Sequence, residues 1–158
     1  MPSRLSRFIR MRIFRAALFF ALFWPVLAPA ATAPLNPYWG VIFPAEQAPA
    51  LARQCSRATP RAEGAWQPLP SDIAKLEPGL TRVLVAAKVQ PGAYYRQYGG
   101  LTVGGRHIIY VNGARNAVVH GDWRTVPISI CDGGALAFGV EYDPATGAFA
   151  HFAFNGQL

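Results

Sequence analysis

The last third of the chain alternates apolar residues with small or polar ones, and glycine pairs interrupt the alternation. Residues 101–103 and 106–111 flank Gly104 and Gly105. Both positions of a two-residue hairpin turn favour positive φ, which glycine adopts without steric cost. Further alternating stretches follow at residues 126–131, 136–142 and 149–155. The pattern predicts about five antiparallel strands in meander order.

Two aspartates begin the turns expected between the later strands. Asp132 precedes two glycines, and Asp143 opens a segment Asp-Pro-Ala-Thr-Gly that ends at Gly147. A carboxylate at the start of a turn accepts hydrogen bonds from the backbone N–H groups that follow it. This structural role accounts for both acids. Pro127 has no N–H donor, so the strand expected at 126–131 should lie at an edge of the sheet.

One helix is expected before these strands. Ser71 is a favourable N-cap, and Asp72 places a negative charge in the first turn. Apolar residues then follow the spacing of one helix face, at Leu80, Val83, Leu84 and Ala87. The sequence predicts a helix over 71–88 that is kinked or restarted at Pro78, although residues 83–85 could equally form a strand.

A proline-rich arm, residues 31–70, precedes this helix. It contains seven prolines, and proline fixes φ and lacks a backbone donor. The arm should therefore be extended, with at most one helical turn near residues 46–54. Its large apolar side chains gain by packing against the core.

A helical segment followed by a meander sheet predicts a single α+β domain over residues 71–158, with the helix covering one sheet face. In element order and in its Asp-Pro-x-Thr-Gly hairpin, the segment 71–155 is similar in outline to the cystatin-like and PepSY-like small domains of exported bacterial proteins. The resemblance concerns architecture alone and implies no activity.

The first thirty residues have the pattern of a secretory signal peptide. Five arginines precede residue 16, and an uncharged run over 16–28 leads to Ala28-Pro29-Ala30, an A-x-A cleavage motif. A membrane-spanning helix needs about 20 apolar residues, so cleavage after Ala30 is favoured over a retained anchor. We expect a periplasmic or secreted protein with no membrane span. The predominance of arginine over lysine is typical of GC-rich bacterial genomes.

The formal charge of +7 belongs mostly to this N-terminal segment. All eight acids follow residue 45, so the chain beyond residue 30 carries a net charge of +2 without clustered cations. Phosphate affinity depends on clustered Lys and Arg, which makes nucleic acid an unexpected partner. A composition of 52% hydrophobic and 15% charged residues argues against intrinsic disorder.

Cys55 and Cys131 are the only cysteines of the chain. In an oxidising compartment an even count predicts one disulfide, which would tie the arm to the core. A catalytic or metal-binding thiol lacks partners, because the sequence has no C-x-x-C motif and no Cys–His spacing typical of metal sites.

Residues with catalytic potential are few, and no catalytic motif accompanies them. His120 and Asp122 could orient a general base or supply two metal ligands, fewer than a zinc site needs. His151 and Glu141 could meet across the last hairpin, although cross-strand polar pairing explains them equally well. His107 fits a packed or edge strand histidine that is hydrogen-bonded to the backbone. We expect no metal and no cofactor.

The expected recognition surface is aromatic. Tyr94, Tyr95, Arg96 and Tyr98 lie within five residues of one another, and Trp123 follows in a later loop. Tyrosines beside an arginine favour recognition and could stack on sugars, peptides or bases. In a further helical turn Tyr94 and Tyr98 would share one side. The alternative is that two of the tyrosines anchor the segment to the sheet.

These patterns favour a non-enzymatic exported module that binds or inhibits an envelope protein or a cell-wall component. One alternative is a structural accessory of an envelope complex that docks through the arm. Another is a small hydrolase or metal-dependent enzyme that uses His120 and Asp122. Convergence of at least two candidate histidines and carboxylates in one polar cleft would favour the enzyme.

Overall fold

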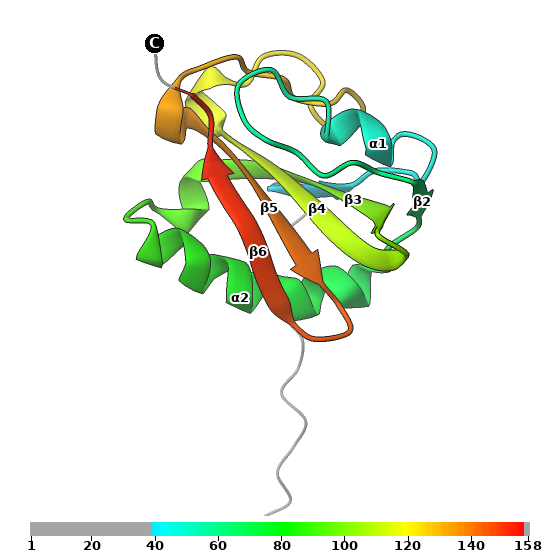
Figure 1. Ribbon diagram of the computed structural model, residues 1–158. Coiled ribbons are helices and arrows are strands. Elements are labelled where there is room, and N and C mark those ends of the chain that lie inside the picture. The colour runs from blue at the N-terminus through cyan, green and yellow to red at the C-terminus, as the bar shows by residue number, and fades with distance from the viewer. Residues whose placement is uncertain (1–38, 157–158) are drawn as a thin grey trace, which may run out of the picture. The chain divides into compact units, whose positions relative to one another are not determined.

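The computed structural model describes residues 39–156, which form a six-stranded sheet with a long helix on one face (Figure 1). The elements in chain order are β1 (Gly40–Ile42), α1 (Ala48–Leu51), β2 (Gly64–Trp66), α2 (Pro70–Ala86), η1 (Pro91–Ala93), β3 (Tyr94–Val103), β4 (Arg106–Arg115), η2 (Asn116–Val118), η3 (Gly134–Leu136), β5 (Ala137–Asp143) and β6 (Ala148–Phe154). Among these residues, no helix has the length and apolarity to cross a bilayer. The expected signal peptide and its cleavage site lie outside the described residues.

Strands β3, β4, β5 and β6 pair antiparallel in chain order, which confirms the predicted α+β meander. Gly104 and Gly105 form the first turn with φ of 57° and 71°. The turn after β5 forms as expected, because Asp143 Oδ1 accepts the N–H of Ala145 at 2.8 Å and Gly147 has φ of 74°. Local turn chemistry therefore fixes both hairpins.

The prediction of a strand over 126–131 is wrong. This segment is a loop that lies on the sheet, and buried amide side chains take the place of a neighbouring strand. The backbone N–H of Ile128 donates to Gln97 Oε1 at 2.8 Å, and its carbonyl accepts from Asn112 Nδ2 at 2.8 Å. Alternation alone does not separate such a loop from a strand, since both are extended.

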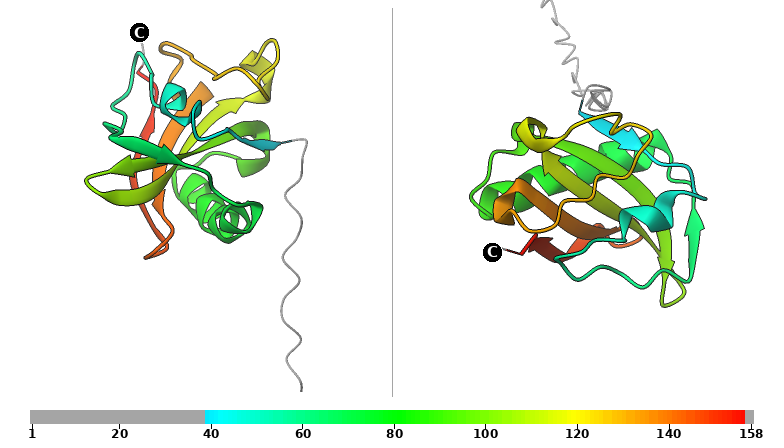
Figure 2. Two further views of the ribbon diagram at one scale, coloured as in Figure 1. Left: turned by 90° about the vertical axis from the view of Figure 1, so that its right-hand side faces the viewer. Right: turned by 90° about the horizontal axis from the view of Figure 1, so that it is seen from above.

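The proline-rich arm supplies the remaining strands. β1 pairs parallel with the first half of β3, and β2 pairs antiparallel with its second half. The short helix α1 lies on the sheet face opposite α2 (Figure 2). One apolar cluster lies between α2 and the sheet, and another is buried on the opposite face. The latter consists of Phe43, Ala48, Leu51, Ala52, Leu101, Ile108 and Tyr110. The described part of the arm thus belongs to the sheet and to its core.

Helix α2 begins one residue earlier than expected. Its N-cap is Leu69, not Ser71, and the Asp72 carboxylate accepts the Leu69 N–H at 2.9 Å. Pro70 suits the first helical position, where no N–H partner is needed. The helix continues through Pro78, and residues 83–85 lie in it. Its sheet-facing side is buried at Ile73, Leu76, Leu80 and Leu84.

The predicted disulfide is confirmed. Cys55 and Cys131 are bonded, with their Cα atoms 5.3 Å apart, and join the arm to the loop before β5. Next to it, Arg57 crosses the sheet face and donates to the Tyr110 hydroxyl at 3.1 Å and to Asn112 Oδ1 at 2.5 Å. A covalent bond and a polar layer together hold the arm and the loop on this face.

Gly100 is required where β2 meets β3, because a Cβ there would lie 2.3 Å from the backbone oxygen of Trp66. We expect Gly100→Ala to displace β2 and lower the free energy of unfolding by about 1–3 kcal/mol. Gly64→Ala is the matched control, since its Cβ would make only an ordinary contact of 3.6 Å with Thr102 Oγ1. Urea denaturation compares the two, and equal stabilities would contradict this packing.

Candidate functional site

Alternation along β3 separates the expected aromatic surface into two sets. Tyr94 and Tyr98 face α2 and are 0% and 1% exposed. Tyr95 faces the opposite side and stacks on Trp123, with ring centroids 4.4 Å apart. Trp123, in the loop after β4, is itself buried. Tyr94, Tyr98 and Trp123 are therefore buried and do not form an exposed recognition surface. Tyr94 and Tyr98 anchor the segment to the core, which is the alternative that the sequence left open. The segment is a strand rather than a helical turn.

The remaining candidate of that set, Arg96, forms a buried ion pair between β3 and α2. Its Nη1 donates to Glu77 Oε2 at 3.0 Å, and the Tyr98 hydroxyl donates to Glu77 Oε1 at 2.5 Å. Arg96 is 8% exposed. Burial, reinforced by the Glu77 carboxylate, raises the pKa of Tyr98 well above its ordinary value of 10.0. Burial also raises the pKa of Tyr110.

Because of these two tyrosines, the free energy of unfolding should fall as the pH rises in the alkaline range. Above pH 10 the unfolded chain releases phenolic protons that the native state retains, so stability is complete below that pH and falls as pH rises toward the folded pKa values. Each tyrosine can contribute up to about 1.4 kcal/mol per pH unit. We expect Tyr98→Phe to lose less stability than the native sequence between about pH 9 and about pH 11. Urea denaturation at both pH values tests this, and identical losses would contradict it.

The three candidate histidines line three different hollows. His120 and Asp122 line one of about 400 Å³ in the loop after β4. Asp122 accepts hydrogen bonds from Thr125 Oγ1 at 2.8 Å and from the Arg124 N–H at 3.2 Å. Its carboxylate thus stabilises its own turn, as an Asx turn does. His151 and His107 lie in the other two hollows.

His151 and Glu141 meet across the last hairpin, with Nδ1 and Oε1 3.0 Å apart. A β-bulge between Gly139 and Glu141 shifts the register, and His151 has φ of 53°. Because Glu141 holds Nδ1 of His151, the Nε2 atom of the ring is available as a proton acceptor, which is the arrangement of a general base. The ring is 76% exposed, however, so cross-strand polar pairing is a sufficient role.

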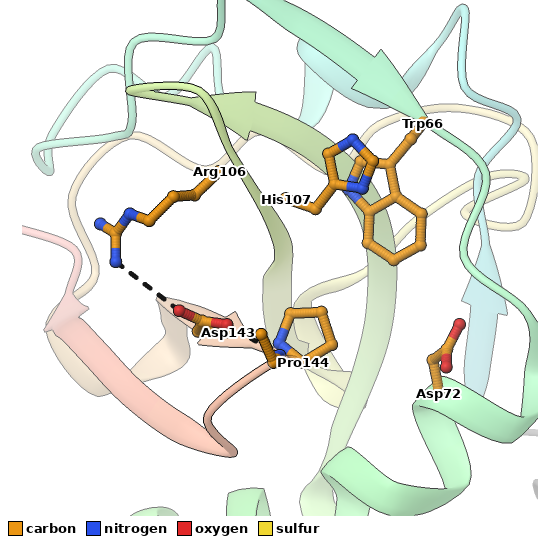
Figure 3. Close-up of a pocket in the computed structure, with 7 residues that line it drawn as sticks. Trp66, Asp72, Arg106, His107, Asp143 and Pro144 are labelled. Atoms are coloured by element: carbon orange, nitrogen blue, oxygen red, sulfur yellow. Dashed lines mark hydrogen bonds and ion pairs between the residues drawn. The ribbon is translucent and has the colours of Figure 1, made fainter.

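The third hollow is an open cleft of about 480 Å³ whose wall is an aromatic stack (Figure 3). Trp66 at the end of β2 and His107 near the start of β4 stack with centroids 4.9 Å apart and an interplanar angle of 10°. The Trp66 indole N–H donates to the carbonyls of Leu101 at 3.2 Å and Ile108 at 3.1 Å. These bonds fix the indole, while His107 remains exposed.

Charged and polar groups from three elements surround this stack. Asp72 comes from the first turn of α2, and Asp143 and Pro144 come from the turn after β5. Arg106 Nη1 lies 3.6 Å from Asp143 Oδ2 (Figure 3). We refer to this site as the Trp66–His107 cleft. It suits a ligand that combines an apolar face with hydrogen-bonding groups around its edge.

The residues proposed from the sequence as site candidates did not include Trp66 or Arg106, and Asp72 and Asp143 were given structural roles only. Trp66 belongs to the arm, and only the pairing of β2 with β3 brings it against His107. Within residues 39–156, no group of three or more His, Cys, Asp or Glu side chains is placed to hold a metal ion. No family model, no curated protein and no solved structure matches the chain.

Proposed function

We propose that this chain is an exported, non-enzymatic binding module whose ligand is a cell-wall glycan held in the Trp66–His107 cleft. The observation that carries the proposal is the parallel stack of Trp66 and His107 on the wall of an open cleft of about 480 Å³. Binding sites of this kind combine aromatic contact area with a few polar groups that orient the ligand.

The chemistry of the cleft favours a sugar. A pyranose ring presents C–H groups on its face, which pack against an aromatic ring, and hydroxyl groups around its edge. Asp72 and Asp143 supply carboxylate acceptors for those hydroxyls, and Arg106 supplies charge-assisted donors. Both carboxylates also bond to backbone N–H groups, which orients them before any ligand arrives.

Export would place this cleft beside the cell wall. The arginine-rich start, the apolar run and the A-x-A motif favour general secretion to the periplasm or the medium. A disulfide is compatible with such an oxidising compartment. His151 shares a hollow with Glu141, and His120 shares another with Asp122. His151 is 76% exposed and Asp122 stabilises its own turn, which disfavours a catalytic role for either pair.

Cosedimentation with purified peptidoglycan sacculi tests the proposal. We expect the protein recovered from the periplasm to sediment with sacculi in a saturable manner. His107→Ala removes half of the aromatic stack and should weaken binding about three- to tenfold. His120→Ala, an exposed histidine in a different hollow, should bind as the native protein does. Absence of sedimentation, or equal binding by both variants, would refute the glycan site.

A further inference from the structure

A smaller cavity of about 120 Å³ lies between α2, β1 and the first half of β3. The buried pair Arg96 and Glu77 forms part of its wall. The rest is lined by Trp39, Gly40, Gly92, Tyr94 and Tyr98. A cavity of this volume has room for several water molecules. The cavity is separate from the Trp66–His107 cleft, with which it shares no lining residue.

Arg96 has more donors than the described residues satisfy. A guanidinium carries five N–H groups. Nη1 donates to Glu77 Oε2 and Nη2 donates to the Pro91 carbonyl at 2.6 Å, whereas Nε has no partner among residues 39–156. Leaving donors of a buried cation without acceptors is costly. An acceptor that enters the cavity and reaches the remaining terminal N–H groups would offset part of this cost.

Glu77, in turn, can accept more hydrogen bonds than it does. Its two oxygens accept one hydrogen bond each, from Arg96 and from the Tyr98 hydroxyl, while an ionised carboxylate offers about four acceptor positions. The cavity wall therefore presents one cation with spare donors and one anion with spare acceptors. A ligand carrying a single charge would leave a net charge in a largely buried site, whereas a zwitterion would leave none.

We propose that this cavity binds a small zwitterionic α-amino acid, with its carboxylate on Arg96 and its ammonium group on Glu77. The rings of Trp39, Tyr94 and Tyr98 in the wall add favourable contact for the ammonium group. The limited volume restricts the side chain to one of about the size of glycine or alanine. This inference is independent of the glycan proposal, because it uses other residues and another ligand.

Four ligands of similar size and different charge separate this proposal from its alternatives. Calorimetric titration and thermal unfolding of the exported protein are carried out with alanine, propionate, alaninamide and propionamide. We expect one saturable site for alanine and a rise in the unfolding temperature with alanine concentration. The other three ligands lack one or both charges and should bind at least about tenfold more weakly. The dipeptide alanyl-alanine distinguishes a free amino acid from a peptide terminus, and should bind at least about tenfold more weakly than alanine.

Substitutions in the cavity wall test whether alanine binds there. Arg96→Lys keeps the positive charge beside Glu77 but loses the planar fork, and should weaken alanine binding at least about tenfold. Gly92→Phe narrows the cavity from a position where a Cβ meets nothing within 4 Å, so it should block binding in a folded protein. Arg115→Lys is the matched control, because the Nε of Arg115 also lacks a partner within residues 39–156, although Arg115 does not line the cavity.

Two kinds of result would overturn the proposal. No saturable binding of any amino acid would mean that the cavity holds water only. Equal affinities for propionate and alanine, or alanine binding that survives both Arg96→Lys and Gly92→Phe, would exclude a zwitterion held by Arg96 and Glu77. Failure of these tests leaves the binding of sacculi unaffected, and failure of the sacculi test leaves these titrations unaffected.

Discussion

The double variant Cys55→Ser with Cys131→Ser is expected to lose about 4–5 kcal/mol of the free energy of unfolding at 25 °C. The bond joins residues 76 apart in sequence, and a cross-link over so long a loop removes much conformational entropy from the unfolded chain. Domains of this size have about 5–15 kcal/mol in total, so the loss is a large share. Urea denaturation of oxidised, reduced and doubly substituted protein measures it.

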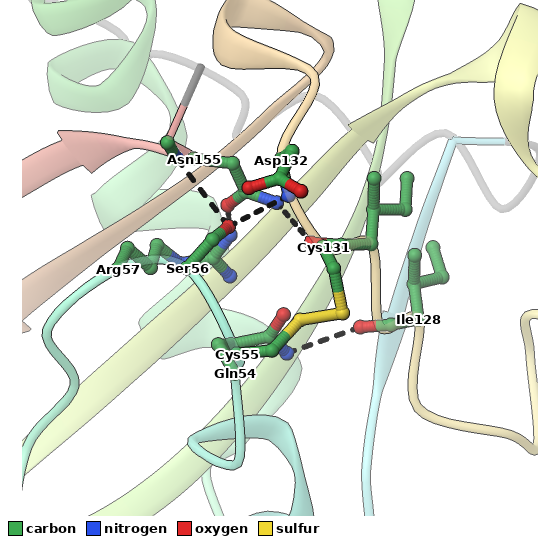
Figure 4. Close-up of a disulfide and its surroundings, with 10 residues drawn as sticks. Gln54, Cys55, Ser56, Arg57, Ile128, Cys131, Asp132 and Asn155 are labelled. Atoms are coloured by element: carbon green, nitrogen blue, oxygen red, sulfur yellow. Dashed lines mark hydrogen bonds between the residues drawn. A yellow bond between two sulfur atoms is a disulfide. The ribbon is translucent and has the colours of Figure 1, made fainter. Parts of the chain in front are cut away.

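The contacts around the disulfide indicate which residues should open first when the bond is removed (Figure 4). Ser56 Oγ accepts the Asp132 N–H at 2.9 Å, and Gln54 Nε2 donates to the Ile128 carbonyl at 3.1 Å. Without the covalent bond, hydrogen bonds of this kind still join the arm to the loop, but they can open separately. Hydrogen exchange should therefore accelerate over residues 54–57 and 128–132 before it does so in β3 and β4. A total loss below about 1 kcal/mol would contradict the assigned role of the bond.

Glu77→Leu is expected to cost about 3–5 kcal/mol, because it leaves the Arg96 guanidinium buried without its counter-charge. The Arg96 side chain is 10% exposed and that of Glu77 is 23% exposed, so water compensates little of the loss. The measurement is the free energy of unfolding from urea denaturation near neutral pH.

A double-variant cycle provides the control for this prediction. Glu77→Leu with Arg96→Leu removes both charges and should be less destabilised than the sum of the two single variants. Leucine fits the apolar surroundings, since the same helix face already buries Ile73 and Leu80. Additive losses would show that the two charges do not stabilise each other in the folded protein.

Local signals made the hairpins and the long helix predictable. Gly104 with Gly105, and Asp143 with Gly147, determine their turns through contacts within five residues. The disulfide was predictable because two cysteines leave a single pairing. The loop over 126–131 was mispredicted, because its hydrogen-bond partners, Gln97 and Asn112, lie on other strands.

The candidate sites were harder to predict, because they depend on long-range pairing. Tyr94 and Tyr98 are buried because they lie on the α2-facing side of a strand, and composition gives no sign of that. Trp66 reaches His107 only through the pairing of the arm with β3. The meeting of His151 with Glu141 was foreseeable, since both lie on the strands of one hairpin.

The glycan proposal is tested most directly by following the backbone and indole N–H signals of the purified, ¹⁵N-labelled protein during titration with soluble peptidoglycan glycan fragments. We expect saturable shifts of the Trp66 indole N–H and of the amides of His107 and Ala145, which line one cleft. The indole signals of Trp39 and Trp123 should stay in place. Absent shifts, or shifts centred on Trp123 and His120, would contradict a glycan site in the Trp66–His107 cleft.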